Sequence, residues 1–193
     1  MRKLITLILV ILLVSLSGCS PNDRNYDGWG LDKPAFSKLE IDPEQVHIRT
    51  QKGLAWVISY ESQTDRSFTG IVRHVSHFTD GKFPFLTHDI LVTSGDFSDP
   101  EAVRTRVMNH HYYWTAKSTP SGSINLLHTV ILDEEVYDQL MQIRANDQVT
   151  ITGREIGSIE YYLDNGRLRS TWSDSGCNTL VVKDVTLVEN DGN

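Results

Sequence analysis

The sequence predicts an α+β fold that is rich in β-strands: a single domain of mostly antiparallel short strands with two short helices. The first observation behind this prediction is the run of residues 147–188, which reads as four β-type segments separated by turn residues. The second is a pair of helix-start signals upstream, at Ser98 and Asp133. The chain has 193 residues, enough for one ordinary domain with a sizeable core.

Upstream of that run, short stretches of apolar, aromatic and β-branched residues predict further strands. Each stretch is bounded by turn-forming residues, and Gly70 inside the longest one suggests a β-bulge. The predicted strands cover residues 46–48, 55–60, 68–78, 88–93, 110–117 and 124–132.

Two segments carry the signals that begin a helix. Ser98 is followed by a proline in the first turn and by a glutamate at the capping-box position, which predicts a short helix over residues 100–108. Asp133 is the predicted N-cap of a second helix that runs to about Arg144, with apolar residues at helical spacing.

The firmest turn signal is the pair Asn165-Gly166. Both central residues of a type I′ turn need positive φ, which asparagine tolerates and glycine adopts freely. We therefore expect residues 159–163 and 167–172 to pair as a tight hairpin.

The second helix leads directly into residues 147–153, D-Q-V-T-I-T-G. This order resembles the helix and following strand of oligonucleotide/oligosaccharide-binding (OB) barrels, and the resemblance implies an OB-like partial barrel. Residues 89–188 also resemble an uncharacterised group of bacterial membrane-anchored proteins. The similarity lies in the aromatic strand that ends at Trp114, the Leu-x-x-His-like element near His128, the helix with its V-T-I-T-G strand, and the closing segment 174–177. It implies the same β-rich fold and brings no known activity.

The N-terminus has the layout of a secretory signal. Positive charge at Arg2 and Lys3 precedes an apolar run over residues 4–16, which is shorter than the about 20 residues that a spanning helix needs. The run ends in Leu16-Ser17-Gly18-Cys19, which resembles the lipobox of bacterial lipoproteins. The resemblance implies cleavage before Cys19, a diacylglycerol thioether on its sulfur and a fatty acyl chain, such as palmitate, on its amine.

We therefore expect a signal peptide over residues 1–18, a tether over residues 19–45 and a β-rich globular domain over residues 46–193. Ser20 stands where an aspartate would resemble the signal for retention in the inner membrane. The sequence accordingly favours a periplasm-facing protein anchored in the cell envelope, at the outer membrane rather than the inner one.

Charge and composition suggest which partners to expect. Removing residues 1–18 takes away two basic side chains and leaves 16 basic against 25 acidic ones, a net charge near −9. Because a phosphate-backbone binder needs clustered Lys and Arg, this balance argues against nucleic acid. The compact basic pairs, Arg104/Arg106 and Arg167/Arg169, are interpreted as solvated faces. The expected partners are the membrane, through the lipid, and another envelope protein; the oligomeric state stays open.

Once Cys19 carries lipid, Cys177 is the one remaining cysteine, which rules out an intramolecular disulfide. It is interpreted first as a buried structural thiol, with an intermolecular partner or a nucleophile as alternatives. The types required for nucleophilic catalysis are present in Cys177, His128 and Asp174, although no cysteine-peptidase signature surrounds them.

Seven histidines raise the question of a metal site. His74 and His77 are three apart, which places them on opposite faces of a strand, and the adjacent pair His110-His111 has the same defect. The dipeptide His88-Asp89 could supply ligands, but no second pair at metal-binding spacing accompanies it. We therefore expect no bound metal and no cofactor.

A set of aromatic residues could form a stacking platform for a sugar or a peptide, although such residues more often pack in a core. The candidates are Tyr112, Trp114, Tyr161 and Trp172.

Taken together, the sequence favours a membrane-anchored, periplasm-facing lipoprotein that acts as a non-catalytic binding module of the cell envelope. The alternative is an envelope hydrolase that uses Cys177 with His128.

Overall fold

The computed structural model describes residues 39–50, 53–78, 80–173 and 176–188. The signal peptide, Cys19 and Asp174 lie outside these residues. The elements in chain order are β1 (Glu40–Ile41), β2 (Gln45–Arg49), β3 (Ala55–Tyr60), β4 (Arg66–His77), β5 (Leu86–Thr93), the 3₁₀ helix η3 (Gly95–Ser98), β6 (Val103–Met108), β7 (His111–Ala116), β8 (Ile124–Val130), α2 (Glu134–Leu140), β9 (Gln148–Tyr162), β10 (Leu168–Ser173) and β11 (Asn178–Val188). Among the described residues, no helix is long and apolar enough to cross a membrane.

Five strands close into a barrel. The hydrogen-bonded order is β4-β5-β8-β11-β9, and β9 pairs back with β4, which completes the ring. Neighbouring strands run antiparallel except for β8 and β11, which are parallel. A five-stranded Greek-key barrel with a helix between its third and fourth strands is the OB architecture. The predicted β-rich, OB-like fold is therefore correct.

The barrel interior is filled by apolar side chains, and α2 covers one part of it. Ile90, Leu127 and Leu180 are fully buried in this cluster, and Val136 and Leu140 of α2 pack into it. Burying each such side chain stabilises the fold by about 1.5–3 kcal/mol. Asp133 is the N-cap of α2, as expected, and accepts hydrogen bonds from the backbone N–H groups of residues 135 and 136. The helix is shorter than predicted.

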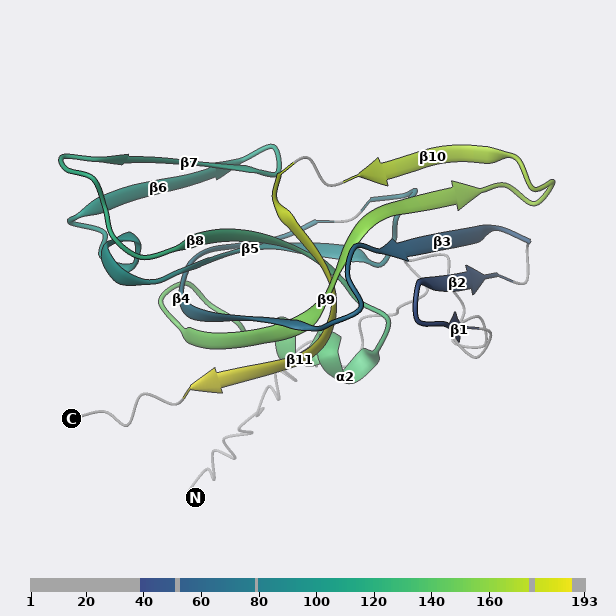
Figure 1. Ribbon diagram of the computed structural model, residues 1–193, viewed down its shortest axis with the longest axis horizontal. Helices are drawn as coiled ribbons and strands as arrows, with labels where there is room; N and C mark the ends of the chain where they lie inside the picture. Colours follow the sequence, from purple (N-terminus) through teal and green to yellow (C-terminus); the bar gives the residue numbers. More distant parts are fainter. Residues whose placement is uncertain (1–38, 51–52, 79, 174–175, 189–193) are drawn as a thin grey trace, which may run out of the picture.

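The longest strand, β9, belongs to two parts of the molecule at once (Figure 1). Its first half pairs with β4 and β11 in the barrel, and its second half pairs with β3 and β10. A second apolar cluster, which includes Trp56, Ile58 and Ile159, packs around this extension. The prediction of four strands over residues 147–188 is wrong, because β9 continues through Gly153 and Gly157 with partners on both edges and the run forms three strands.

The first predicted helix is also wrong. Residues 100–108 form one turn, closed by the Val103 N–H bonding to the Asp99 carbonyl, and then strand β6. The capping signal at Ser98 competes with a run in which β-branched residues alternate with arginines, and that period of two suits a strand. Ser98 instead ends η3. Among the described residues, α2 is therefore the one α-helix.

The hairpin between β9 and β10 is present, but its turn differs from the predicted one. Gly166 has φ 76°, whereas Asn165 is not among the residues with positive φ. The Gly166 N–H bonds to the carbonyl of Leu163, and the Leu163 N–H bonds to the carbonyl of Arg167. This is a type I turn followed by a left-handed glycine, the three-residue hairpin loop. The type I′ prediction is wrong, while the pairing itself is confirmed.

Gly70 is needed for close backbone approach and not for a bulge. A Cβ built on it would lie 2.1 Å from the carbonyl oxygen of Thr93 on β5. The register shift between β4 and β5 falls instead between Val72 and His74.

Replacing Gly166 with valine should lower the free energy of unfolding by about 1–3 kcal/mol, because a β-branched residue is strained at positive φ. Urea denaturation of the two proteins measures this change. Asn165→Ala is the matched control: Asn165 lacks positive φ, so its loss should cost about 1 kcal/mol, the value of its hydrogen bond from the Arg167 N–H. Equal effects of the two substitutions would contradict the assigned turn.

Candidate ligand site on the outer face of the barrel

Strand β5 is buried along its whole length, although one of its faces points away from the barrel core. Ile90 belongs to the barrel core, and alternation along the strand therefore turns Asp89 and Leu91 outward. On β8, the same rule turns Leu126 and His128 outward. These four residues are at most 3 % exposed, so another part of the chain must cover them.

The cover includes the β6–β7 hairpin, which lies beside β5 and β8 in Figure 1. At its base, Trp114 packs edge-on against Phe97 of η3, with ring centroids 5.5 Å apart. At its tip, the turn between β6 and β7 reaches the outward-facing Asp89. The hairpin is a separate two-stranded sheet that is not paired with a barrel strand. These side-chain contacts therefore hold it in position over the barrel.

Sheet register places the first two members of the candidate site together. Asp89 on β5 lies directly opposite His128 on β8. Directly opposed side chains of an antiparallel pair point the same way and lie close enough to interact. The Nδ1 atom of His128 is 2.7 Å from Oδ1 of Asp89, and both residues are 3 % exposed.

The third member is His110, which lies in the β6–β7 turn and contacts the other carboxylate oxygen of Asp89. The turn residues Asn109 and His110 have φ values of 52° and 61°. Both positive values fit a type I′ turn, in which glycine is the preferred residue at the place that His110 occupies. Nδ1 of His110 is 2.9 Å from Oδ2 of Asp89, and the His110 side chain is 41 % exposed. We call Asp89, His110 and His128 the Asp-His-His site.

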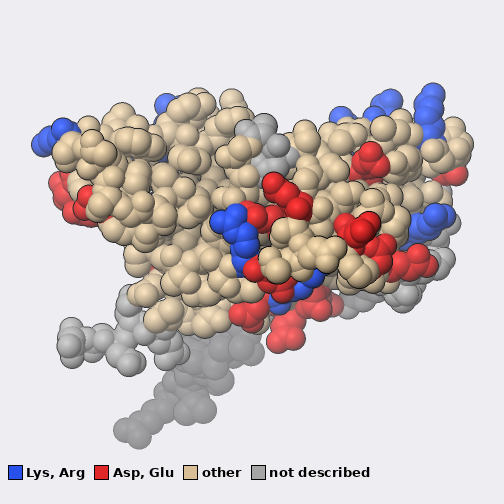
Figure 2. Space-filling model, in the orientation of Figure 1, with Lys and Arg blue, Asp and Glu red and all other residues tan. Residues whose placement is uncertain are grey.

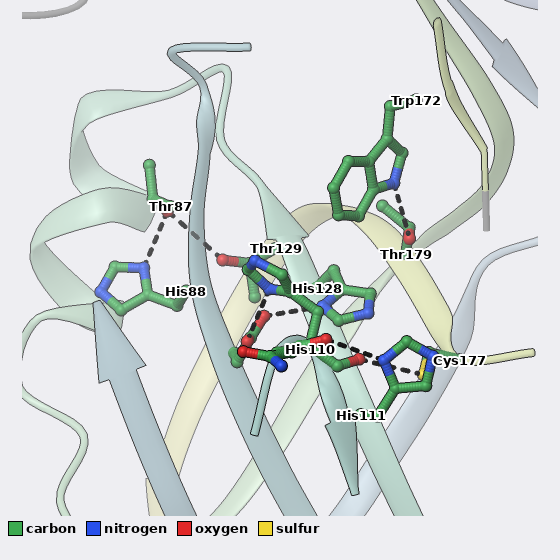
Figure 3. Close-up of polar contacts among 11 residues, drawn as sticks. Thr87, His88, His110, His111, His128, Thr129, Trp172, Cys177 and Thr179 are labelled. Atoms are coloured by element: carbon green, nitrogen blue, oxygen red, sulfur yellow. Dashed lines mark hydrogen bonds and ion pairs between the residues drawn. The ribbon is translucent and has the colours of Figure 1, made fainter. Parts of the chain in front are cut away.

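Two aromatic rings and one thiol lie around the Asp-His-His site, and Figure 3 shows Trp172 and Cys177 beside the two histidines. Trp172 of β10 meets the rings of His110 and His128 edge-on, at centroid distances of 5.9 and 5.6 Å. Phe78 packs against His110 from the β4–β5 connection, at 4.7 Å. The Cys177 thiol donates to the backbone carbonyl of His110, with sulfur and oxygen 3.6 Å apart. The site is thus walled by apolar groups and opens to solvent at His110.

The charge balance of the site is unusual for a buried carboxylate. Within the described part of the chain, the ion pairs of Asp89 are with His110 and His128. The Asp89 side chain is 5 % exposed, and its two oxygens contact the two imidazoles. A buried charge is costly unless it is paired, so this arrangement favours a positive charge at the site.

A different histidine cluster occupies the opposite side of β5. His88 bonds through Nδ1 to the Thr87 hydroxyl, and its ring lies 4.9 Å from that of His77. Burial, with a smaller contribution from the charge of His77, lowers the pKa of His88 to about 3. His88 is therefore neutral at physiological pH and acts as a buried hydrogen-bonding residue.

The aromatic residues singled out from the sequence lie in separate surroundings. Tyr161 stacks on Trp56 at 5.1 Å in the second apolar cluster. Trp114 packs on Phe97, and Tyr112 is half-buried beside it on β7. Trp172 alone among the four borders the Asp-His-His site, where its indole N–H donates to the Thr179 hydroxyl.

The structure also places the candidate catalytic residues. His128 is oriented by Asp89, on the neighbouring strand, and Asp174 lies outside the described residues. Cys177 reaches the same region through its contact with the His110 carbonyl.

Sequence reasoning considered Asp89 only beside His88 and His110 only beside His111, and it missed that Asp89 and His110 meet. The argument that adjacent histidines point to opposite faces assumed that His110 lies in a strand, whereas it lies in a turn. The available signal was Asn109, because asparagine tolerates the positive φ that a two-residue hairpin turn needs between two β-type runs, here Val103–Met108 and His111–Ala116. That reading would have placed His110 at an exposed tip.

No family model matches the chain, and no curated protein matches it. One solved structure with a matching fold is a mitochondrial single-stranded DNA-binding protein from S. cerevisiae, Rim1. It is 12 % identical, with a TM-score of 0.29, and the match covers 66 % of this chain and 96 % of that one.

The exclusion of nucleic acid made from net charge is therefore withdrawn, because the matching structure is that of a single-stranded DNA-binding protein. Net charge is an average over the molecule and conceals local differences. Figure 2 shows several basic side chains at the end that carries the β9–β10 turn, while acidic and basic side chains lie mixed across the centre. At this low similarity, the match concerns the fold and gives no argument that this chain binds DNA.

Proposed function

We propose that this protein is a lipid-anchored binding module of the cell envelope, and that the Asp-His-His site is where it binds its ligand. The observation that carries the proposal is the convergence of Asp89, His110 and His128 from three separate elements on one half-open site. The proposed location, facing the periplasm from the outer membrane, rests on the sequence of the N-terminus.

The position of the site supports binding. In OB folds, ligands are held by the face of the second and third barrel strands and by the loops after the first and fourth strands. Here those strands are β5 and β8, and the loops contribute Phe78 and Trp172. The β6–β7 hairpin fills much of that face, which favours a small ligand over an extended polymer. This step is an analogy of fold, and the donor groups of the site must supply the specificity.

Binding is favoured over catalysis by the state of the thiol. A cysteine nucleophile must be a thiolate, whereas the Cys177 sulfur lies 3.6 Å from the His110 carbonyl oxygen, a neighbour that suits a thiol donor better than a thiolate. The hydrolase remains the second candidate, because Asp89 orients His128 as a carboxylate orients the base of a catalytic triad.

The anchor is tested by Cys19→Ser. If Cys19 carries the lipid, the substitution should abolish incorporation of labelled palmitate and release the protein from the membrane fraction, because acyl chains contribute about 0.8 kcal/mol per buried CH₂. Cys177→Ser is the matched control and should stay labelled. Palmitate incorporation that survives Cys19→Ser would show that the lipobox reading is wrong.

The choice between binding and catalysis is tested by alkylation of Cys177 with iodoacetamide. We expect slow labelling of the folded protein at pH 6 and fast labelling after unfolding in urea, because a protonated, half-buried thiol is a poor nucleophile. Cys177→Ala should cost about 1 kcal/mol of stability through the small cavity it leaves. Rapid labelling of the folded protein at pH 6 would instead favour the hydrolase.

A further inference from the structure

We propose that Asp89, His110 and His128 bind a divalent first-row transition metal ion, with Zn²⁺ as the ion that the ligand set suits best. The inference rests on the proposed function, since it names the ligand of the same site. It departs from the expectation of no metal, which considered histidines that are neighbours in sequence. The three residues of this site are 18 or more positions apart, and the fold brings them together.

The chemistry of the three ligands fits such an ion. Two imidazole nitrogens and one carboxylate oxygen are ligands that Zn²⁺ accepts in proteins, and imidazole also suits Cu²⁺, Fe²⁺ and Ni²⁺. Ca²⁺ and Mg²⁺ prefer oxygen ligands and are disfavoured here. Three protein ligands leave a fourth position of a tetrahedral ion open, on the side where His110 reaches solvent.

The ligand atoms are close enough for one ion to reach all three residues. One ligand atom from each residue can be chosen so that all three lie within 4.8 Å of one another. His128 and His110 bond to different oxygens of Asp89, at 2.7 and 2.9 Å, so one of these oxygens would serve as the ligand and the three atoms would adjust to metal bonds of about 2.0–2.2 Å. A cation placed between these atoms replaces the two hydrogen bonds with three coordinate bonds.

Metal binding at this site also requires no net loss of protons from neutral histidines. A neutral imidazole that donates from Nδ1 moves its proton to Nε2 when Nδ1 coordinates the metal, so neutral histidines release no proton overall. The ion would give the buried carboxylate a cationic partner. Of the three ligands, His110 is the one that comes from the β6–β7 hairpin, whereas Asp89 and His128 lie on barrel strands. Metal binding would therefore pin the β6–β7 hairpin to the barrel.

The test is calorimetric titration of the full-length protein, purified in detergent and stripped with a chelator, with Zn²⁺ alone. We expect one equivalent per chain. His110→Gly removes a ligand while giving the turn its preferred residue, so it should fold normally and lose more affinity than the about 10–100-fold that loss of a supporting hydrogen bond costs. His128→Gln should have the same effect.

His111→Gln is the matched control, because His111 is exposed and bonds through Nδ1 to the Asn109 carbonyl. It should keep wild-type affinity. The melting temperature of the wild type and of this control should rise with Zn²⁺, and that of His110→Gly should not. Absence of Zn²⁺ binding by the wild type, or binding unaffected by both His110→Gly and His128→Gln, would overturn the proposal.

Failure of this inference and failure of the proposed function give different results. If Zn²⁺ does not bind while Cys177 stays unreactive in the folded state, the metal inference fails and the binding module stands. If Cys177 reacts rapidly at pH 6, the binding module fails whatever the titration shows.

Discussion

The carboxylate of Asp89, shared between two imidazoles on the outside of a barrel, is the interaction on which the candidate site depends. One oxygen bonds to His128 within the sheet, and the other bonds to His110 from a separate hairpin. The same side chain thus closes a cross-strand pair and docks the β6–β7 hairpin. Without these two hydrogen bonds the buried carboxylate would be left without donors, which costs free energy, so both histidines stabilise it in this position.

The barrel supplies the rigid part of this arrangement and the hairpin supplies the adjustable part. Asp89 and His128 lie on paired strands with a closed ring of hydrogen bonds behind them, which fixes their separation. His110 occupies a turn position that glycine would fill with less strain, and non-glycine residues at positive φ cluster at functional sites. The conformational cost at the turn is offset by the contacts that the imidazole makes.

Local signals predicted much of the fold, whereas the site required non-local information. The Asp133 cap and the hairpin around Gly166 were recoverable because a few adjacent residues determine them. The helix predicted over residues 100–108 was wrong because the capping signal at Ser98 is followed by a stronger pattern, in which β-branched residues alternate with arginines at a period of two. The closed barrel and the approach of Asp89 to His128 depend on the register between strands 39 positions apart, which spacing along one strand does not reveal.

The most direct test of this account is a double-mutant cycle between Asp89→Asn and His110→Gly, measured by urea denaturation with a chelator present. The account predicts a favourable coupling of about 0.5–3 kcal/mol, since the two side chains are in contact. The pair Asp89→Asn and His111→Gln should couple by less than about 0.5 kcal/mol. If the coupling between Asp89 and His110 is as small as that of the control pair, the shared carboxylate does not hold the hairpin and the account is wrong.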